Sequence, residues 1–496
     1  MSSGDVNSIT KTEKPHLLIY AHYYHPDAAS TGQIIKDLAE GMLDTFKITV
    51  ICVVPSYLGV VEDKWKTQKY YFENIMGVEV LRVSVPEFKK SNKKSRVKNI
   101  LAYFFRAMKA TGKVGRVDYI MSVSQPPILG GLLGVWGKWT LKSQNGRRTQ
   151  YRNLIYMCER KTYSEEGELI DGAEDWMIAE TAVKDRTSKS PHYIYQIQDF
   201  NPEQTLAVGY SKNKFITGLM MFLDKFSCKH ADLVITVGRD LVETLNGRFK
   251  DKNGEVKNVP KSVLINNWID EKEIYPLEPT HPRVVEFKKR YGLMGEEGTN
   301  DKFVIMYSGN IGLYYDLENL MKVIEKFQDA HTPPTTNYPN GREVVFAFVG
   351  AGSVLEKLIL YKNSHHLENV TFIPYQDKED LIYSLNAGDV HWCVNARGIK
   401  GVSVPSKVYG IVSAGKPILG VLDRGSEARL LIEETGCGKC HRPGDYEGIE
   451  ELMKWFIENG ESEELRTMGM RGREYLVENL TKDISVEKYK RAILES

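Results

Sequence analysis

Short apolar segments alternate along the chain with longer segments in which apolar residues recur every three or four positions. A first series of near-continuous apolar segments covers residues 16–21, 47–54, 78–84, 118–124, 192–197 and 232–237. A second series covers residues 302–309, 344–350, 369–374, 389–394 and 417–421. Continuous apolarity over a few residues is typical of parallel strands that are buried on both faces. The pattern therefore predicts two groups of buried strands.

The segments between these strands have the period of amphipathic helices. After the capping residues Ser30 and Thr31, one apolar face is marked by Ile34, Ile35, Leu38, Ala39, Met42 and Leu43. After Asp316, a second face is marked by Leu317, Leu320, Met321, Ile324 and Phe327. This alternation predicts an α/β fold with two Rossmann-like, doubly wound domains facing across a cleft. We expect the domains over residues 1–275 and 276–480.

Residues 141–191 interrupt the alternation. Between Glu159 and Asp185 there are nine acidic residues and three basic ones. We expect a surface insertion here, built as a small hairpin plus a helix. It is either a solvated addition or an element that binds a partner or shapes an acceptor site.

Charge and composition narrow the classes of function. The chain has 66 Lys and Arg against 65 Asp and Glu, a balance that argues against global nucleic-acid binding. Six scattered cysteines fit a reducing compartment, and Cys437 and Cys440 are interpreted as small residues near a strand rather than zinc ligands. The sequence has no long apolar run and begins without a signal-peptide core. We therefore expect a cytoplasmic protein, with a peripheral membrane position also compatible.

One segment is strongly basic. Residues 89–116 carry ten Lys or Arg and no acidic residue, with interleaved apolar residues Ile100, Leu101, Tyr103, Phe104, Phe105 and Met108. This pattern favours a basic amphipathic helix on an anionic membrane surface. The alternative is a helix packed on the core with a solvated basic face.

Two strand-to-helix connections have the composition of anion sites. Tyr307–Gly312 follows an apolar segment, and its glycines let backbone amides approach a ligand. In the stretch VPSKVYG, Ser406 and Lys407 follow Pro405 at the start of a helix, where a lysine opposes the helix dipole. Such a lysine suggests a compensating anion, and phosphate is the natural one. The alternatives are a tight turn without a ligand and a lysine that extends into water.

Further polar residues follow other predicted strands. Ser426 and Glu427 follow the strand at 417–421, and the carboxylate is a candidate for binding ribose hydroxyls or for capping a helix. Small residues near Gly32 open the first helix, and Asp199 lies in the segment Gln198–Glu203 after another strand. Arg397 and Lys400 lie upstream of Lys407 and are candidates for added positive charge.

Taken in order, several of these stretches resemble one family. HYYHPDAASTGQ, SVSQPPILGG, YQIQDFNPEQ, LINNWIDEKEIYPL, MYSGNIGLYYDLENL, FVGAGSVLEKL and VPSKVYGIVSAGKPILGVLDRGSEARL are similar to segments of the retaining GT-B glycosyltransferases of family 4, in the branch that builds bacterial surface polysaccharides. The similarity runs from about residue 15 to the end, excluding most of residues 141–191.

The resemblance implies a nucleotide-sugar site in the second domain and an acceptor site in the first. Predicted donor-binding residues are Gly32, Ser308, Gly309, Asn310, Gly312, Gly350, Tyr375, Arg397, Ser406, Lys407, Ser426 and Glu427. Predicted catalytic residues are Lys407 and Asp199, and no metal is required. The final helix, residues 481–496, is expected to cross back to the first domain.

The sequence departs from the family pattern at two positions. Many members carry two glutamates where this chain has Val402 and Gly410, so Glu427 is expected to take over the ribose contact. The predicted reaction is hexosyl transfer from a UDP- or GDP-linked sugar to a lipid-linked or polysaccharide acceptor. The alternatives are a nucleotide-sugar epimerase and a catalytically silent, membrane-associated scaffold.

Overall fold

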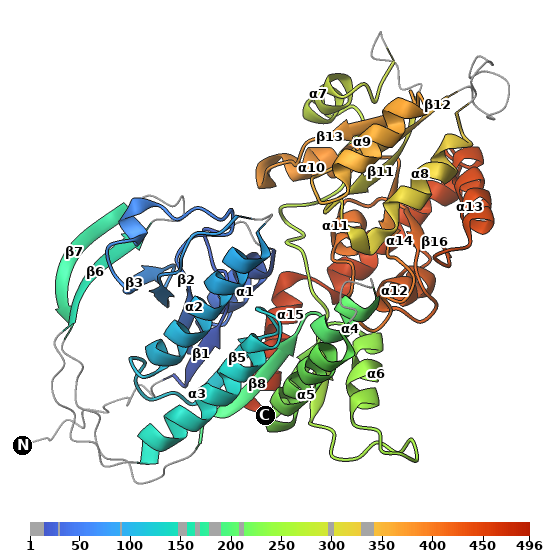
Figure 1. Cartoon of the computed structure of the whole chain (residues 1–496). Coiled ribbons are helices and arrows are strands. Elements are labelled where there is room, and N and C mark those ends of the chain that lie inside the picture. The colour runs from blue at the N-terminus through green and yellow to red at the C-terminus, as the bar shows by residue number, and fades with distance from the viewer. Residues whose placement is uncertain are drawn as a thin grey trace, which may run out of the picture. The chain divides into compact units, whose positions relative to one another are not determined.

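Strands and helices alternate through most of the chain. The computed structural model describes residues 14–27, 30–89, 92–146, 156–163, 169–177, 190–207, 213–295, 302–328 and 342–496. Within them the chain forms two sheets flanked by helices (Figure 1).

The first sheet has ten strands in the order β10-β9-β8-β5-β1-β2-β4-β3-β6-β7. Its central pairs are parallel, while β3 pairs antiparallel with β4 and β6 pairs antiparallel with β7. The strands are β1 (His16–Tyr20), β2 (Lys47–Val53), β3 (Tyr70–Ile75), β4 (Val78–Val83), β5 (Tyr119–Val123), β6 (Tyr156–Tyr163), β7 (Leu169–Met177), β8 (His192–Ile197), β9 (Leu233–Thr236) and β10 (Ser262–Leu264).

The helices in this part of the sequence connect successive strands. They are α1 (Ser30–Gly41), a short 3-10 helix (Asp63–Trp65), α2 (Lys93–Thr111), α3 (Leu129–Gly146), α4 (Asn201–Ala207), α5 (Lys214–His230) and α6 (Arg239–Arg248). Helix α2 begins after Asn92, whose side chain accepts hydrogen bonds from the backbone N–H groups of Lys94 and Ser95. This cap satisfies amides that the first turn of a helix leaves free.

The second sheet has six strands, and all of its pairs are parallel, in the order β13-β12-β11-β14-β15-β16. The strands are β11 (Lys302–Ser308), β12 (Glu343–Val349), β13 (Val370–Ile373), β14 (Val390–Val394), β15 (Ile418–Val421) and β16 (Gly438–His441). Their apolar side chains, with Trp392 and Phe346 among the most buried, form a core with the covering helices.

Helices of the C-terminal half cover this sheet, except the last of them, most of which belongs to unit 1. They are α7 (Pro282–Arg290), a 3-10 helix (Leu313–Tyr315), α8 (Leu317–Glu325), α9 (Leu355–Ser364), α10 (Lys378–Ala387), α11 (Lys407–Ser413), α12 (Glu427–Thr435), α13 (Tyr446–Glu458), α14 (Glu463–Asn479) and α15 (Lys482–Leu494). Asp316 precedes α8 in the left-handed region, at φ 53°, and its carboxylate accepts from Asn319 and from the Tyr446 hydroxyl.

Every apolar segment that predicts a strand forms one, so the predicted doubly wound α/β architecture is confirmed. Strands β3, β10 and β16 were not expected. The expected hairpin in the insertion is present as β6 and β7, and β6 joins the sheet beside β3. The expected helix of the insertion lies outside the described residues.

The chain divides into two compact units. Unit 1 consists of Met1–Gln196, Phe222–Ile235 and Val486–Ser496, and unit 2 consists of Ile197–Met221 and Thr236–Ser485. The division runs through α5, and residues 236–275 fall in unit 2 rather than with the N-terminal segment. The predicted domain boundaries at 275 and 480 remain predictions.

The described helices do not include one whose length and apolarity together suit a transmembrane span.

Candidate functional site

Two glycine turns pack against each other at the ends of β11 and β12 in unit 2. Gly309 and Gly350 both have φ of 139°, a backbone conformation that favours glycine. A Cβ atom on Gly350 would lie 2.0 Å from the backbone oxygen of Gly309, so this contact requires glycine. The N–H of Gly309 donates to the carbonyl of Val349 at 2.9 Å. The turns therefore meet backbone to backbone, as the glycines in the sequence suggest.

The rest of the first turn is held by the preceding tyrosine. The Tyr307 hydroxyl donates to the carbonyl of Asn310 at 2.6 Å. The Asn310 side chain lies next to Gly312, where a Cβ atom would be 2.9 Å from Nδ2. Ser308 is partly buried and Asn310 is exposed. Tyr307 thus fixes the turn that carries three of the predicted donor-binding residues.

Lys407 lies at this turn. It is the first residue of α11, and its Nζ donates to the Tyr307 hydroxyl at 2.8 Å. The same Nζ is 4.1 Å from the centre of the Tyr307 ring and 3.8 Å from the centre of the Tyr315 ring. A Cβ atom on Gly309 would lie 3.7 Å from Lys407 Cε. We call Tyr307, Gly309, Tyr315 and Lys407 the lysine cluster.

The ammonium of the lysine cluster has aromatic neighbours but no counter-charge. Among the residues that the structure describes, no carboxylate forms an ion pair with Lys407. Burial lowers the pKa of Lys407 to about 7, because removing an ammonium from water disfavours its charged form. Aromatic faces stabilise a cation only modestly. An anion beside Nζ would restore the charged form, so the cluster suits an anionic ligand.

Asp199 lies beside the same aromatic group. It follows β8 and forms an antiparallel bridge with Ser403, whose hydroxyl donates to the carboxylate. Burial raises the pKa of Asp199 above its usual range. The pKa of Tyr315 is raised to about 12, first by burial and then by the negative charge of Asp199. Both predicted catalytic residues, Asp199 and Lys407, are therefore close enough to Tyr315 to interact with it.

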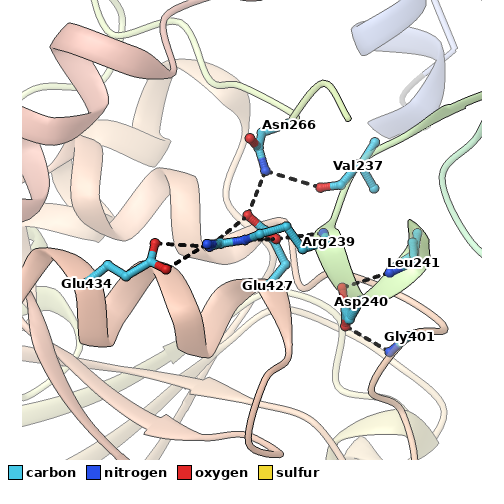
Figure 2. A network of polar contacts seen from close by, with 8 residues as sticks. All are labelled: Val237, Arg239, Asp240, Leu241, Asn266, Gly401, Glu427 and Glu434. Atoms are coloured by element: carbon cyan, nitrogen blue, oxygen red, sulfur yellow. Dashed lines mark hydrogen bonds and ion pairs between the residues drawn. The ribbon is translucent and has the colours of Figure 1, made fainter. Parts of the chain in front are cut away.

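Glu427 is at the centre of a polar network in unit 2 (Figure 2). Its Oε2 accepts from the N–H of Arg239 at 2.7 Å and from Arg239 Nε at 2.9 Å, and its Oε1 accepts from Asn266 Nδ2 at 3.0 Å. The far end of Arg239 donates to Glu434 at 2.6 and 3.1 Å. Both oxygens of Glu427 are thus engaged by protein groups. A ribose contact through Glu427 remains a prediction.

Asp240 ties α6 to the loop that leads to Lys407. Its Oδ2 accepts from the N–H of Gly401 at 2.8 Å, and burial raises the pKa of this carboxyl (Figure 2). Gly401 has φ of 72°, and a Cβ atom there would lie 2.3 Å from Thr244 Oγ1. In the sequence, Asp240 could have been recognised by its place directly after a predicted strand, in the segment Gly238–Asp240, but it was not among the predicted site residues.

The remaining predicted residues lie outside the lysine cluster. Tyr375 follows β13 and is 68% exposed, and Arg397 is exposed without an ion pair among the described residues. Ser406 is exposed and precedes α11, while the Ser426 hydroxyl donates to the carbonyl of Asp423 at 2.8 Å. Lys400, considered as an additional charge, is 3.5 Å from Glu243.

Gly32 belongs to unit 1. It lies in α1, where a Cβ atom would be 3.3 Å from the backbone of Tyr23. Its small size therefore serves a close approach within unit 1, and its contact with a donor stays a prediction.

Parts of the chain are similar to known glycosyltransferases. Residues 294–475 match the family model "Glycosyl transferases group 1". The chain is 26% identical over 299 residues to the probable glycosyltransferase WbjE of Pseudomonas aeruginosa, covering 60% of this chain and 66% of WbjE. It is 24% identical over 261 residues to the putative colanic acid biosynthesis glycosyl transferase WcaI of Escherichia coli K12, covering 52% of this chain and 58% of WcaI. The chain thus spans less than two thirds of either relative.

The fold is shared with solved structures. Anabaena HepE, crystallised with UDP and glucose, superposes with a TM-score of 0.58 at 12% identity, covering 97% of this chain and 99% of HepE. This similarity confirms the predicted GT-B fold. The matched domain and the two named relatives support the enzyme class that the sequence predicts, a glycosyltransferase.

Proposed function

We propose that the chain transfers a hexosyl group from a UDP- or GDP-linked sugar, with retention at the anomeric carbon, as in glycosyltransferase family 4. The observation that carries this proposal is the Lys407 ammonium, which has two tyrosine rings and a glycine turn around it and no carboxylate paired with it among the described residues. A nucleotide diphosphate supplies the missing negative charge. UDP is the first candidate because HepE, which shares the fold, was crystallised with it.

Transfer of the sugar leaves negative charge on the diphosphate. Groups that are already oriented toward the place where charge develops lower the barrier most. Lys407 and the backbone N–H groups of Asn310 and Gly312 are the groups proposed for this role, since the N–H groups of Gly309 and Ile311 already donate to the carbonyls of Val349 and Ala351. We expect the reaction to need no metal, and transfer measured in EDTA tests this expectation.

Asp199 is proposed to bind hydroxyls of the acceptor or of the donor sugar. Its raised pKa makes it a weaker acid than an ordinary aspartic acid, which suits proton transfer closer to neutral pH. We name no nucleophile, because retaining enzymes of this fold have no agreed one.

The proposed acceptor is a lipid-linked saccharide or a growing surface polysaccharide. WcaI, named for colanic acid biosynthesis, supports this class. Such an acceptor places the enzyme in the cytoplasm at the inner face of the membrane, and residues 89–116 are proposed to contact anionic lipid. Most of this segment forms α2, which has its Tyr103 buried and its Phe105 exposed.

The test is a thermal-shift series with UDP, GDP and their sugars. A ligand that binds the native state raises the melting temperature. We expect one nucleotide to give a selective shift that Lys407→Ala abolishes and Lys400→Ala retains, since Lys400 is already paired with Glu243. If no nucleotide shifts the wild-type chain, the silent-scaffold alternative is favoured. Conversion of the nucleotide-sugar without any acceptor favours the epimerase.

A further inference from the structure

Three helices of the N-terminal half form a continuous layer. Trp136 of α3 donates from Nε1 to the carbonyl of Met108 in α2 at 3.4 Å. One turn further along α3, the centre of the Trp139 ring lies 6.1 Å from that of Phe226 and 5.7 Å from that of His230, both in α5. Helix α3 therefore lies between α2 and the C-terminal part of α5 (Figure 1).

Large apolar side chains are exposed on all three helices. On α2 they recur every fourth residue at Val97, Leu101 and Phe105, so they share one face. Phe105 is 57% exposed, Trp139 of α3 is 50% exposed and Phe222 of α5 is 65% exposed. The N-terminal part of α5, which belongs to unit 2, also exposes Phe215, Ile216 and Leu219. Exposed apolar surface of this extent marks an interaction site.

The same three helices are almost free of negative charge. Asp224 is the only acidic residue in their sequences. It is 3% exposed, and its Oδ1 accepts from the Tyr195 hydroxyl at 2.7 Å, so it contributes no surface charge.

The same helices carry exposed positive charge. Exposed cations on the layer include Lys94, Arg96, Lys98, Lys109 and Lys229. None of the five forms an ion pair with a carboxylate among the residues that the structure describes. Unpaired cations beside exposed Trp and Phe are the combination that an anionic lipid surface stabilises, because the rings enter the interface while the ammonium groups meet the headgroups.

We infer that the outer surface of α2, α3 and α5 docks on an anionic lipid bilayer, with Phe105, Trp139 and Phe222 inserted at the level of the headgroups. This inference extends the proposed membrane contact from residues 89–116 to three helices, and it rests on the membrane location in the proposed function. A partner protein with acidic residues would match the cations but would not need a face with three large aromatic side chains.

The test is co-sedimentation of the full chain with vesicles. The wild-type chain should bind vesicles of phosphatidylglycerol and phosphatidylcholine and bind poorly to phosphatidylcholine alone, and added NaCl should weaken the binding. The double variant Phe105→Ser with Phe222→Ser should lose at least about tenfold in partition coefficient, since two exposed apolar side chains no longer enter the interface. Its matched control is Leu360→Ser, which changes an equally exposed residue of α9 and should bind as wild type.

A second pair of variants tests the charges. Lys109→Ala should weaken binding about fivefold, the effect of one cation at an anionic surface. Lys289→Ala removes an exposed cation of α7 and should change nothing.

Three results would overturn the inference. The wild-type chain could fail to bind anionic vesicles, or the double variant could bind as tightly as Leu360→Ser. Light scattering could also show a wild-type dimer that the double variant dissociates, which would assign the face to a second copy. A nucleotide thermal shift, measured in parallel, separates this inference from the proposed transferase activity, because each can fail while the other holds.

Discussion

Arg82 in unit 1 and Lys407 in unit 2 are both cations withdrawn from water, but their surroundings differ. Arg82 is 1% exposed, forms an ion pair with the buried Glu73, and donates to the carbonyls of Val53 and His25. Lys407 has one hydroxyl partner and two ring faces. The described residues therefore supply the Arg82 guanidinium with a counter-charge and hydrogen-bond acceptors, but they supply the Lys407 ammonium with no counter-charge.

This difference in surroundings distinguishes a cation that stabilises the fold from a cation that suits a ligand. A buried charge is tolerated when a counter-charge and hydrogen bonds compensate for its lost hydration. Arg82 meets that condition within unit 1. Lys407 meets it only when something outside the protein supplies an anion, which is why the lowered pKa of Lys407 accompanies the proposed diphosphate site.

The largest expected effect is on stability and concerns Arg82. Glu73→Gln leaves the buried guanidinium without its counter-charge, and we expect a loss of about 3–5 kcal/mol in the free energy of unfolding. Urea denaturation measures this change. The matched control is Glu79→Gln, in the neighbouring strand, which breaks a half-exposed ion pair with Lys47 and should cost about 1 kcal/mol or less. Equal losses in the two variants would remove the distinction between the two kinds of cation.

The next effect is on catalysis. Lys407→Ala removes the proposed charge partner of the leaving group, and we expect the transfer rate to fall about 100- to 1000-fold, as for the loss of one transition-state hydrogen-bond donor. The measurement is initial-rate kinetics with the donor that the thermal-shift series identifies. The control is Lys400→Ala, in the loop that precedes α11. A Lys407→Ala variant with normal kcat would show that this ammonium is not part of the reaction.

A smaller effect concerns the glycine turns. Gly350→Ala places a Cβ atom 2.0 Å from the Gly309 carbonyl oxygen, so the turns must separate. We expect a loss of about 1–3 kcal/mol in stability together with weaker donor binding. Gly398→Ala is the control, because it also has positive φ but no heavy atom within 4 Å of the added Cβ. Titration calorimetry should show normal donor affinity in that control.

The smallest effect is a dependence of donor affinity on pH. With its pKa lowered to about 7, Lys407 is protonated below that pH and loses its charge above it, so binding of an anion weakens as the pH rises. Between pH 7.5 and 8.5 the dissociation constant should increase by up to about tenfold. Lys407→Arg keeps its charge throughout and should give a flat profile. A flat wild-type profile would mean that the bound ligand does not depend on this charge.

Much of the fold and part of the site follow from local sequence. The buried strands were predictable because continuous apolar segments have few other uses in a chain of this composition. The Gly309 turn and Lys407 were predictable because glycine and a lysine at a helix start each conflict with ordinary local preferences. Strand β16 was not, since its residues Gly438–His441 are only partly buried and are placed by pairing with β15.

Other site residues could not be predicted from the sequence, for a different reason. Tyr307 and Tyr315 have the pattern of ordinary core positions, and only the fold brings Lys407, far along the sequence, onto their rings. Arg239 and Glu427 are likewise distant in sequence, and their pairing depends on the packing of α6 near α12. The sequence shows a carboxylate after a strand, but it does not show which hydrogen bonds the two oxygens of that carboxylate already accept from the protein.

The last residues of the chain belong to unit 1, where Lys490 pairs with Asp44 at 2.7 Å and Tyr489 bonds to Gln196. Unit 1 is therefore assembled from three separate stretches, and the third of them is synthesised after the whole of unit 2. We expect its packing to be completed only after unit 2 has been synthesised, although most of the sequence of unit 1 is made first. Chimeras that exchange the N-terminal half between such proteins need to carry Val486–Ser496 with it, or the recipient will receive an unfinished unit.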